Sequence, residues 1–298
     1  MTRLAILADI HGNRPALQAV LADLDQHAVD QVIVAGDVVN WGPFNAAVMD
    51  VVLARGWAVI RGNNEYYLLD HRTPRAPAAW SNRRQWAMLD WLREQLPGPY
   101  HRAIAAWPDT LSLRYPDAPA LRIVHGTPRA NNEPLYPDST EEEIAAALAG
   151  VEERTVIAAH THLPVDRHAA GYHLLNPGSV GVPLDGLHQG RYLLLDGDAD
   201  GWHPTFRSVP IDPAPVLAEL ERQRFREQIG LVAHFVFAEF AKARLELMPF
   251  LVWRRTHCPD APFGEELLAD YAAVNPLDFM PAAYRAGWQV TEGDHDAA

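Results

Sequence analysis

Cysteine is almost absent from this sequence, and long apolar runs are missing. The single cysteine, Cys258, cannot form a disulfide within the chain, which excludes a disulfide-stabilised secreted fold. The longest apolar stretch in the later part of the chain, LVAHFVFAEF, contains His234 and Glu239 and is about half the length of a membrane helix, which needs roughly 20 residues. Near the start, Asp9 and His11 interrupt a short apolar run, so it lacks the layout of a signal peptide. We therefore expect a cytoplasmic protein with no membrane partner.

Positive charge is also scarce. The chain has 25 Lys and Arg residues against 38 Asp and Glu residues, which gives a formal net charge of -13. Nucleic-acid-binding proteins carry basic patches, and no run of Lys and Arg is present, so the charge argues against a nucleic-acid ligand. An acidic protein that handles an anionic substrate needs local positive charge, and bound metal ions can supply it. With 48% hydrophobic and 21% charged residues, the composition is that of a globular protein.

Short apolar runs alternate with helical patterns in the first sixty residues. Residues 4–8, 31–35 and 58–60 are predicted strands, while the segment after Pro15 and residues 46–53 are predicted helices. This β-α-β-α-β order predicts a parallel sheet with right-handed crossovers. Polar side chains follow each strand, at the edge of the sheet where ligands of such folds gather.

The following segments predict an α/β body of two packed sheets flanked by helices. A helical insert of two or three helices is expected at about residues 65–109, and a helix at 140–148 would be capped by Ser139 or Thr140 with Glu142 or Glu143. Further short strands are predicted at residues 110–115, 121–125, 155–159, 165–168, 172–175, 192–195 and 205–209. Turns between the last four predict antiparallel pairing.

The composition changes after residue 211, where Pro213 and Pro215 mark a boundary. We predict one domain over residues 1–211 and a helical extension over residues 212–298, with one long helix or two shorter ones at 216–247. The extension is expected to pack against the body or against another copy of the chain, which would give a homo-oligomer. The apolar cluster from Met248 to Trp253 fits a core, a dimer contact or a lid equally well. The final GDHDAA is expected to be frayed.

Five segments place metal-ligating residue types directly after predicted strands. They are Asp9-Ile10-His11, Gly36-Asp37, Gly62-Asn63-Asn64-Glu65, His125-Gly126 and His160-Thr161-His162. Oxygen and imidazole donors without thiolate suit Mn, Fe, Zn, Ni or Co, and exclude a structural zinc finger. On a turn leaving a strand, side chains two residues apart can reach one metal or two adjacent ones, and Asp37 has two oxygens that could bridge two cations. Each segment alone is also compatible with an ordinary turn or a buried histidine, whereas the joint pattern predicts a metal site.

The combination resembles the calcineurin-like metallophosphoesterases, whose signature is D-x-H, G-D, G-N-H-D/E, H and G-H-x-H. Two segments, Asp9–Leu17 and Leu175–Gly181, resemble the small bacterial and archaeal phosphodiesterase-type members more closely, and the resemblance covers roughly residues 3–209. It implies a four-layer α/β/β/α sandwich with two divalent transition metals, manganese first and Fe, Zn, Ni or Co as alternatives. The implied ligands are Asp9, His11 and His162 for one metal, Asn63, His125 and His160 for the other, and Asp37 as the bridge.

Two positions depart from the signature. Ala159 replaces the glycine before His160, and Asn64 replaces the histidine of G-N-H, which in the family contacts the phosphate and helps the leaving group. The second replacement removes the usual acid, which favours substrates with good leaving groups or another residue in that role, with His71 as a weak candidate.

The implied function is hydrolysis of a phosphodiester or phosphomonoester, in a small phosphoester or a nucleotide, by a hydroxide that bridges the metals. Asp37, Asn63 and His125 would form the catalytic centre. The predicted substrate-binding residues follow strand ends and are Asn13, Asn40, Asn64 and Arg129. The alternatives are a protein serine/threonine phosphatase, and a metal-binding regulatory protein with little turnover.

Overall fold

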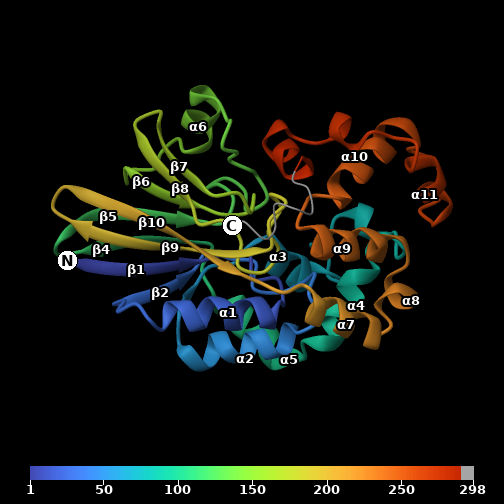
Figure 1. Ribbon diagram of the computed structural model, residues 1–298, viewed down its shortest axis with the longest axis horizontal. Helices are drawn as coiled ribbons and strands as arrows, with labels where there is room; N and C mark the ends of the chain where they lie inside the picture. Colours follow the sequence, from blue (N-terminus) through green and yellow to red (C-terminus); the bar gives the residue numbers. More distant parts are fainter. Residues whose placement is uncertain (290–298) are drawn as a thin grey trace.

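Two five-stranded sheets form the body of the protein in a computed structural model that describes residues 1–289 (Figure 1). The first sheet has the order β10 (Gly201–Pro210), β9 (Gln189–Asp198), β1 (Thr2–Leu7), β2 (Gln31–Val34) and β3 (Ala58–Val59). The second has the order β4 (Thr110–Tyr115), β5 (Ala118–Val124), β6 (Thr155–Ala158), β8 (Tyr172–Asn176) and β7 (Val165–Ala169). Strands β1, β2 and β3 are parallel, as predicted, and β7–β8 and β9–β10 are the predicted antiparallel pairs.

Successive side chains of a strand point to opposite faces of the sheet, and this alternation separates the apolar core into layers. In β1, Leu4 and Ile6 are buried between the two sheets, while Ala5 and Leu7 are buried on the opposite face, under helices. A third apolar cluster lies on the outer face of the second sheet, where α6 (Glu141–Ala147) packs. The result is the predicted four-layer α/β/β/α sandwich.

Helices α1 (Arg14–Leu24) and α2 (Asn45–Arg55) cover the outer face of the first sheet (Figure 1). The predicted insert contains α3 (Asn63–Asp70), the 3-10 helix η1 (Ala78–Ser81), α4 (Ala87–Gln95) and α5 (Gly98–Ala106). Helix α6 begins with the predicted capping box: Thr140 accepts a hydrogen bond from the Glu143 amide, and Glu143 accepts one from the Thr140 amide.

The prediction of one or two helices over residues 216–247 is wrong. The segment forms three helices, α7 (Ala214–Arg222), α8 (Phe225–Ile229) and α9 (Leu231–Lys242). Arg224 (φ 56°) and Gly230 (φ 69°) adopt left-handed backbone conformations, which end one helix before the next begins. The chain continues through α10 (Leu247–His257), α11 (Glu266–Tyr271), η2 (Pro276–Phe279) and η3 (Ala282–Trp288).

These C-terminal helices gather beside α3 and α4, at the end of the sandwich toward which β1 and β2 point (Figure 1). Their side chains belong to the same apolar cluster as the helical face of the first sheet; for example, the Phe225 ring lies 4.8 Å from that of Trp91. Phe250 and Trp253 are buried in this core, so part of the Met248–Trp253 cluster is core. No helix within residues 1–289 is long and apolar enough to cross a membrane. The predicted frayed tail lies outside the described residues, and oligomer formation stays a prediction.

Candidate metal centre

The predicted ligands converge although they come from five separate segments. Asp9, His11 and His162 form one group that could hold a metal ion, and Asp37, His125 and His160 form another; within each group, one ligand atom of every residue lies within 4.8 Å of the others. Asn63 joins the second group, since its Oδ1 is 3.1 Å from His125 Nε2. The carboxyl ends of the strands meet at this edge of the sandwich, which is why residues so distant in sequence become neighbours.

Asp37 faces both groups. Its Oδ2 lies 3.7 Å from His11 Nε2 in the first group and 3.3 Å from His125 Nε2 in the second. Burial alone would raise the pKa of Asp37, but the neighbouring His125 and His11 outweigh burial and hold the pKa well below its usual range. The carboxylate is therefore ionised and sits where it can serve two cations.

Asp9 supplies the test of whether a cation fits. Both of its carboxylate oxygens are buried, and neither has a hydrogen-bond partner among residues 1–289. A buried carboxylate without hydrogen bonds is unfavourable, and a divalent cation shared with the nearby His162 Nε2, 3.4 Å from Asp9 Oδ1, is a partner that this donor set can accept. The residues present therefore fit a metal ion.

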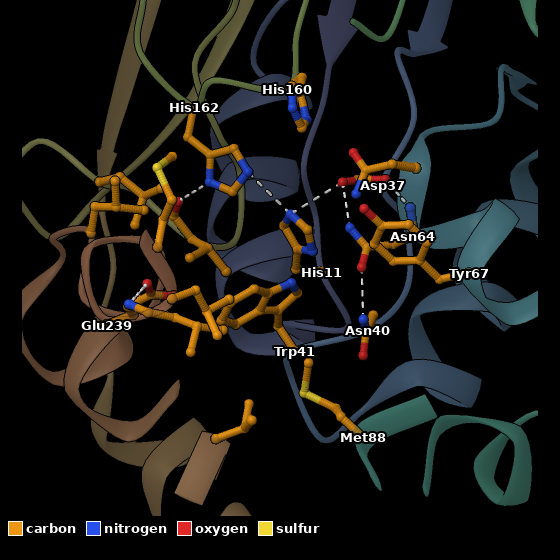
Figure 2. Close-up of a pocket in the computed structure, with 18 of the residues that line it drawn as sticks. His11, Asp37, Asn40, Trp41, Asn64, Tyr67, Met88, His160, His162 and Glu239 are labelled. Carbon is orange, nitrogen blue, oxygen red and sulfur yellow. Dashed lines mark hydrogen bonds and ion pairs between the residues drawn. The ribbon is translucent and has the colours of Figure 1, made fainter. Parts of the chain in front are cut away.

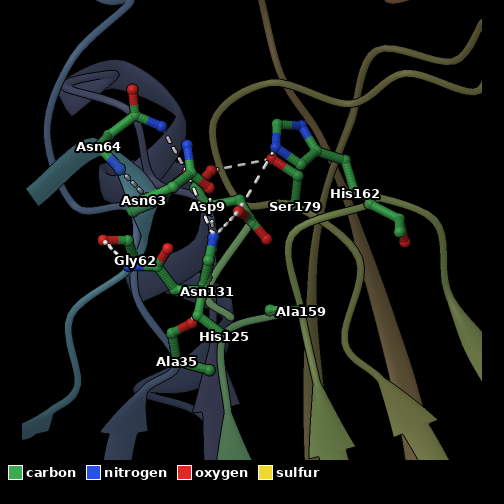
Figure 3. A network of polar contacts seen from close by, with 12 residues as sticks. Asp9, Ala35, Gly62, Asn63, Asn64, His125, Asn131, Ala159, His162 and Ser179 are labelled. Atoms are coloured by element: carbon green, nitrogen blue, oxygen red, sulfur yellow. Dashed lines mark hydrogen bonds and ion pairs between the residues drawn. The ribbon is translucent and has the colours of Figure 1, made fainter. Parts of the chain in front are cut away.

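The imidazoles are oriented as metal ligands are. His125 Nδ1 donates to the Ala35 carbonyl at 2.8 Å, and His162 Nδ1 donates to the Val182 carbonyl at 2.5 Å (Figure 3 shows the network around Asp9 and His125). Because a carbonyl only accepts, the proton sits on Nδ1, and the lone pair of Nε2 faces the centre in each ring when neutral. Burial lowers the pKa of His11 and of His160 to about 4, so both are neutral and able to ligate at pH 7.

The ligands sit on left-handed turns. Five of them are non-glycine residues with positive φ: Asp9 (54°), His11 (51°), Asp37 (53°), His160 (68°) and His162 (61°). Such conformations cost free energy and persist where the surroundings hold them. Backbone bonds do so here, for example from the His11 amide to the Asp37 carbonyl at 3.0 Å. Local strain of this kind is typical of functional sites.

Glu65 holds the turn that carries Asp37. Its buried carboxylate accepts hydrogen bonds from the backbone amides of Asp37, Val38, Val39 and Gly62 at 2.7–3.2 Å. Burial, together with the nearby Asp37 charge, raises the pKa of Glu65 to about 7. The sequence motif contains this residue, but its positioning role becomes visible only in the structure.

The Leu175–Gly181 segment supports the Asp9 turn. Ser179 Oγ donates to the Asp9 carbonyl at 2.8 Å, and the Gly181 amide donates to the same carbonyl at 3.0 Å. A Cβ at Gly181 would lie only 1.9 Å from the Ile10 carbonyl oxygen, so the close approach requires glycine. The Leu175–Gly181 segment therefore stabilises the backbone turn that carries Asp9.

A cavity of about 330 Å³ opens beside the ligands. Asn40 and Asn64, both predicted to bind substrate, line it together with His11, Asp37, Asn63, His160 and His162 (Figure 2). Met248 and Leu251, from the cluster predicted to be core, a dimer contact or a lid, also line it. Sequence reasoning missed other aromatic and apolar lining residues, which include Trp41, Tyr67, Met88 and Tyr284.

Two predicted substrate-binding residues do not line this cavity. Asn13 is the N-cap of α1: its Oδ1 accepts from the Ala16 amide and its Nδ2 donates to the Gly181 carbonyl. Its position just before Pro15 is an N-cap signal that the sequence already contained. Arg129 instead pairs with Glu133 in an exposed loop. His71, the candidate acid, is also outside the lining, with its Nε2 2.6 Å from Asp90.

The sequence matches one family along most of its length. The profile of the Calcineurin-like phosphoesterase superfamily domain matches residues 2–200. An uncharacterized protein of Methanocaldococcus jannaschii is 21% identical over 210 residues, which cover 65% of this chain and 82% of that protein. Phosphodiesterase YfcE of Escherichia coli K12 is 25% identical over 199 residues, which cover 66% of this chain and 89% of that protein.

Solved structures share the fold. A metallophosphoesterase from Sphaerobacter thermophilus matches with a TM-score of 0.63 at 22% identity, covering 81% of this chain and 99% of that one. A hypothetical protein from Pyrococcus horikoshii OT3 matches with a TM-score of 0.67 at 22% identity, covering 78% of this chain and 98% of that one. At these identities the match establishes the architecture.

Proposed function

Because the chain belongs to the calcineurin-like phosphoesterase superfamily, we propose that it is a hydrolase of phosphoesters that works with two divalent cations. The observation that carries the proposal is the position of Asp37, whose Oδ2 faces His11 on one side and His125 on the other. A single carboxylate between two sets of oxygen and imidazole donors is suited to two adjacent cations, whose repulsion it reduces.

The cations would be held by the predicted residues. Asp9, His11 and His162 would hold one, Asn63, His125 and His160 the other, and Asp37 both. When bound, such cations supply positive charge for a phosphoryl group and activate water at neutral pH. The mixed oxygen and imidazole donors suit manganese, and equally iron, zinc, nickel or cobalt.

The chain's own residues position the substrate. Asn64 and Asn40 line the cavity next to Asp37, and Asn40 Oδ1 is buried without a partner among the described residues. Asn64 Nδ2 is already bound to Asp37 at 2.6 Å, so it orients the carboxylate. An amide cannot donate a proton to a leaving group as an imidazolium does. We therefore favour esters whose leaving group departs without an acid.

A phosphodiester is the preferred substrate class, because YfcE of E. coli, a relative, is a phosphodiesterase. The loss of the motif histidine favours one other candidate, a metal-binding regulatory protein with little turnover. Metal binding without hydrolysis of any ester in a broad panel would support that candidate. No contact described above favours a protein phosphatase.

The test removes and restores the metal. Protein stripped with a chelator should be inactive toward bis(p-nitrophenyl) phosphate and p-nitrophenyl phosphate, and manganese should restore activity with about two ions per chain by elemental analysis. Asp37→Asn should lower kcat/KM by at least about a thousandfold and reduce the bound metal, whereas Asp25→Asn, an exposed change, should do neither. Full activity in Asp37→Asn, or full activity without metal, would overturn the proposal.

A further inference from the structure

The cavity beside the metal residues has an apolar, aromatic wall to which the C-terminal helices contribute. Val232 comes from α9, Leu247, Met248 and Leu251 from α10, and Tyr284 from η3. Next to the candidate ligands, Trp41 lies edge-on to His11, with ring centroids 6.3 Å apart. The helices beyond residue 211 therefore form part of the space next to the site, in addition to packing on the core.

Within residues 1–289, no lysine or arginine lines this cavity. The bound cations would neutralise the negative charge of Asp37 and of the ligands beside it. The other carboxylate in the lining, Glu239, lies across the view from Asp37 in Figure 2, with Trp41 between them. A second phosphate or a carboxylate in the apolar part would find no cation there, and burying an uncompensated charge is costly.

Glu239 cannot pair with a second anionic group of a substrate. Its Oε1 accepts hydrogen bonds at 2.9 Å from the amides of Glu246 and Leu247, at the start of α10. The side chain thus holds the helix that supplies much of the apolar wall. When ionised, its carboxylate would repel a second anion.

We propose that the site acts on phosphoesters whose organic group is apolar, alkyl or aryl, and carries no second anionic group. The proposal rests on the phosphoesterase function above and adds the substrate class. The scissile phosphate would lie against Asp37 and the histidines, and the organic group would lie among Trp41, Met248 and Leu251. A volume of about 330 Å³ is in the range of small-molecule pockets, which suits a group of a few carbons or one ring.

Binding of phosphonates tests the proposal without requiring turnover. Titration calorimetry of manganese-loaded protein should give a Kd for butylphosphonate at least about tenfold lower than for methylphosphonate, because each buried methylene adds up to about fourfold in affinity. Methylenediphosphonate, which carries a second anionic group, should not gain over methylphosphonate. Equal Kd values for the two alkylphosphonates, tightest binding of the diphosphonate, or no phosphonate binding at all would overturn the proposal.

A cation placed in the wall should reverse the preference. Leu251→Lys should bring the two alkylphosphonate Kd values within about threefold of each other and tighten the binding of methylenediphosphonate. Val252→Lys, one residue along α10 at a partly exposed position outside the lining, should retain the wild-type ratio and is the matched control. Equal metal content and unfolding midpoints would show that both variants are folded. An unchanged ratio in Leu251→Lys would contradict the assigned wall.

A hydrolysis assay separates this proposal from the proposed function. Butyl p-nitrophenyl phosphate should have a higher kcat/KM than methyl p-nitrophenyl phosphate, although both release the same p-nitrophenolate. Hydrolysis without this preference would leave the phosphoesterase function standing and overturn the substrate class. Selective binding of butylphosphonate with no hydrolysis of any ester would overturn the phosphoesterase function and leave the preference for an apolar organic group standing.

Discussion

Asn64 donates two hydrogen bonds to the Asp37 carboxylate: its backbone N–H lies 2.8 Å from Oδ1, and its side-chain Nδ2 lies 2.6 Å from Oδ2. Asn40 Nδ2 in turn donates to Asn64 Oδ1 at 2.6 Å, which fixes the orientation of the Asn64 amide. The residue that replaces the motif histidine is thus a positioning residue for the carboxylate between the two ligand groups.

Removing this support should loosen the metal site. Asn64→Ala keeps the backbone bond to Asp37 but removes the side-chain bond, so we expect metal affinity to fall about 10–100-fold. Metal titration in competition with a fluorescent chelator measures this, and saturating manganese should recover most of the activity. Asn82→Ala, an exposed asparagine in the insert, provides the control. Unchanged metal affinity in Asn64→Ala would show that the side-chain bond is dispensable.

Restoring the histidine should change which esters are hydrolysed. Asn64→His places an imidazole where the family signature has one, and because an imidazolium can protonate a leaving group, kcat should increase more for alkyl leaving groups than for p-nitrophenolate. The measurement is the ratio of kcat for an ester with an alkyl leaving group to kcat for an ester that releases p-nitrophenolate, compared between variant and wild type. A ratio that does not change would indicate that the leaving group needs no acid at this position.

Loss of Glu65 should cost stability as well as metal binding. Glu65→Ala leaves four buried backbone amides without their acceptor, those of Asp37, Val38, Val39 and Gly62. We expect a loss of about 3 kcal/mol or more in the free energy of unfolding, since each unpaired buried amide costs about 1–3 kcal/mol. Urea denaturation of metal-free protein measures it. Glu94→Ala, at an exposed site on α4, should change stability by less than about 0.5 kcal/mol.

A methyl group at Gly181 should disturb the Asp9 turn. The Cβ of Gly181→Ala would overlap the Ile10 carbonyl, and overpacking of this kind costs about 1–3 kcal/mol, with a matching loss of metal affinity. Gly98→Ala in α5 is the matched control, because its Cβ would have a nearest neighbour at 3.5 Å, the end of the Arg102 side chain. Equal unfolding midpoints for the two variants would refute the predicted clash.

Glu239 should make stability depend on pH in one direction. Burial raises its pKa to about 7, above the value of about 4.5 expected in the unfolded chain. The contribution of Glu239 to the free energy of unfolding is therefore fully present below pH 4.5 and is lost as the pH rises through 7. Glu239→Gln keeps an acceptor for the α10 amides but does not ionise. It should match wild type near pH 5 and be more stable by about 1–3 kcal/mol at pH 8. Denaturant unfolding at both pH values, with equal metal loading, measures this difference; a pH-independent difference would contradict it.

The convergence of the candidate metal ligands could be predicted because its signals are local. Each candidate residue follows an apolar strand and sits in a short motif, and parallel strands bring such motifs to one edge of a sheet. Asp9, Asp37 and His125 could therefore be grouped from the order of segments alone. The two departures, Ala159 and Asn64, were equally visible in the sequence.

The residues that line the cavity were harder to predict, because position after a strand does not determine where a side chain points. Asn13 and Asn40 both follow predicted strands, yet Asn13 caps α1 and only Asn40 reaches the cavity. Arg129 follows β5 but turns to Glu133. The Asn13–Ala16 and Arg129–Glu133 contacts are local, whereas the bond from Asn13 Nδ2 to the Gly181 carbonyl joins distant segments and appears only in the folded chain.

The sequence by itself determined the family and the layered α/β architecture, because strand alternation and motif residue types are encoded within a few neighbouring positions. It also predicted the ligand set, and the structure brings those side chains together. Only the tertiary structure decided that α7, α8 and α9 are separate helices and that α9 and α10 wall the cavity beside the ligands. It also decided that Asn64 and Glu65 hold the Asp37 carboxylate and its turn. These features arise from packing and hydrogen bonds between separate segments of the chain, 27 residues apart for Asn64 and Asp37, or from backbone conformations that a residue type permits without requiring.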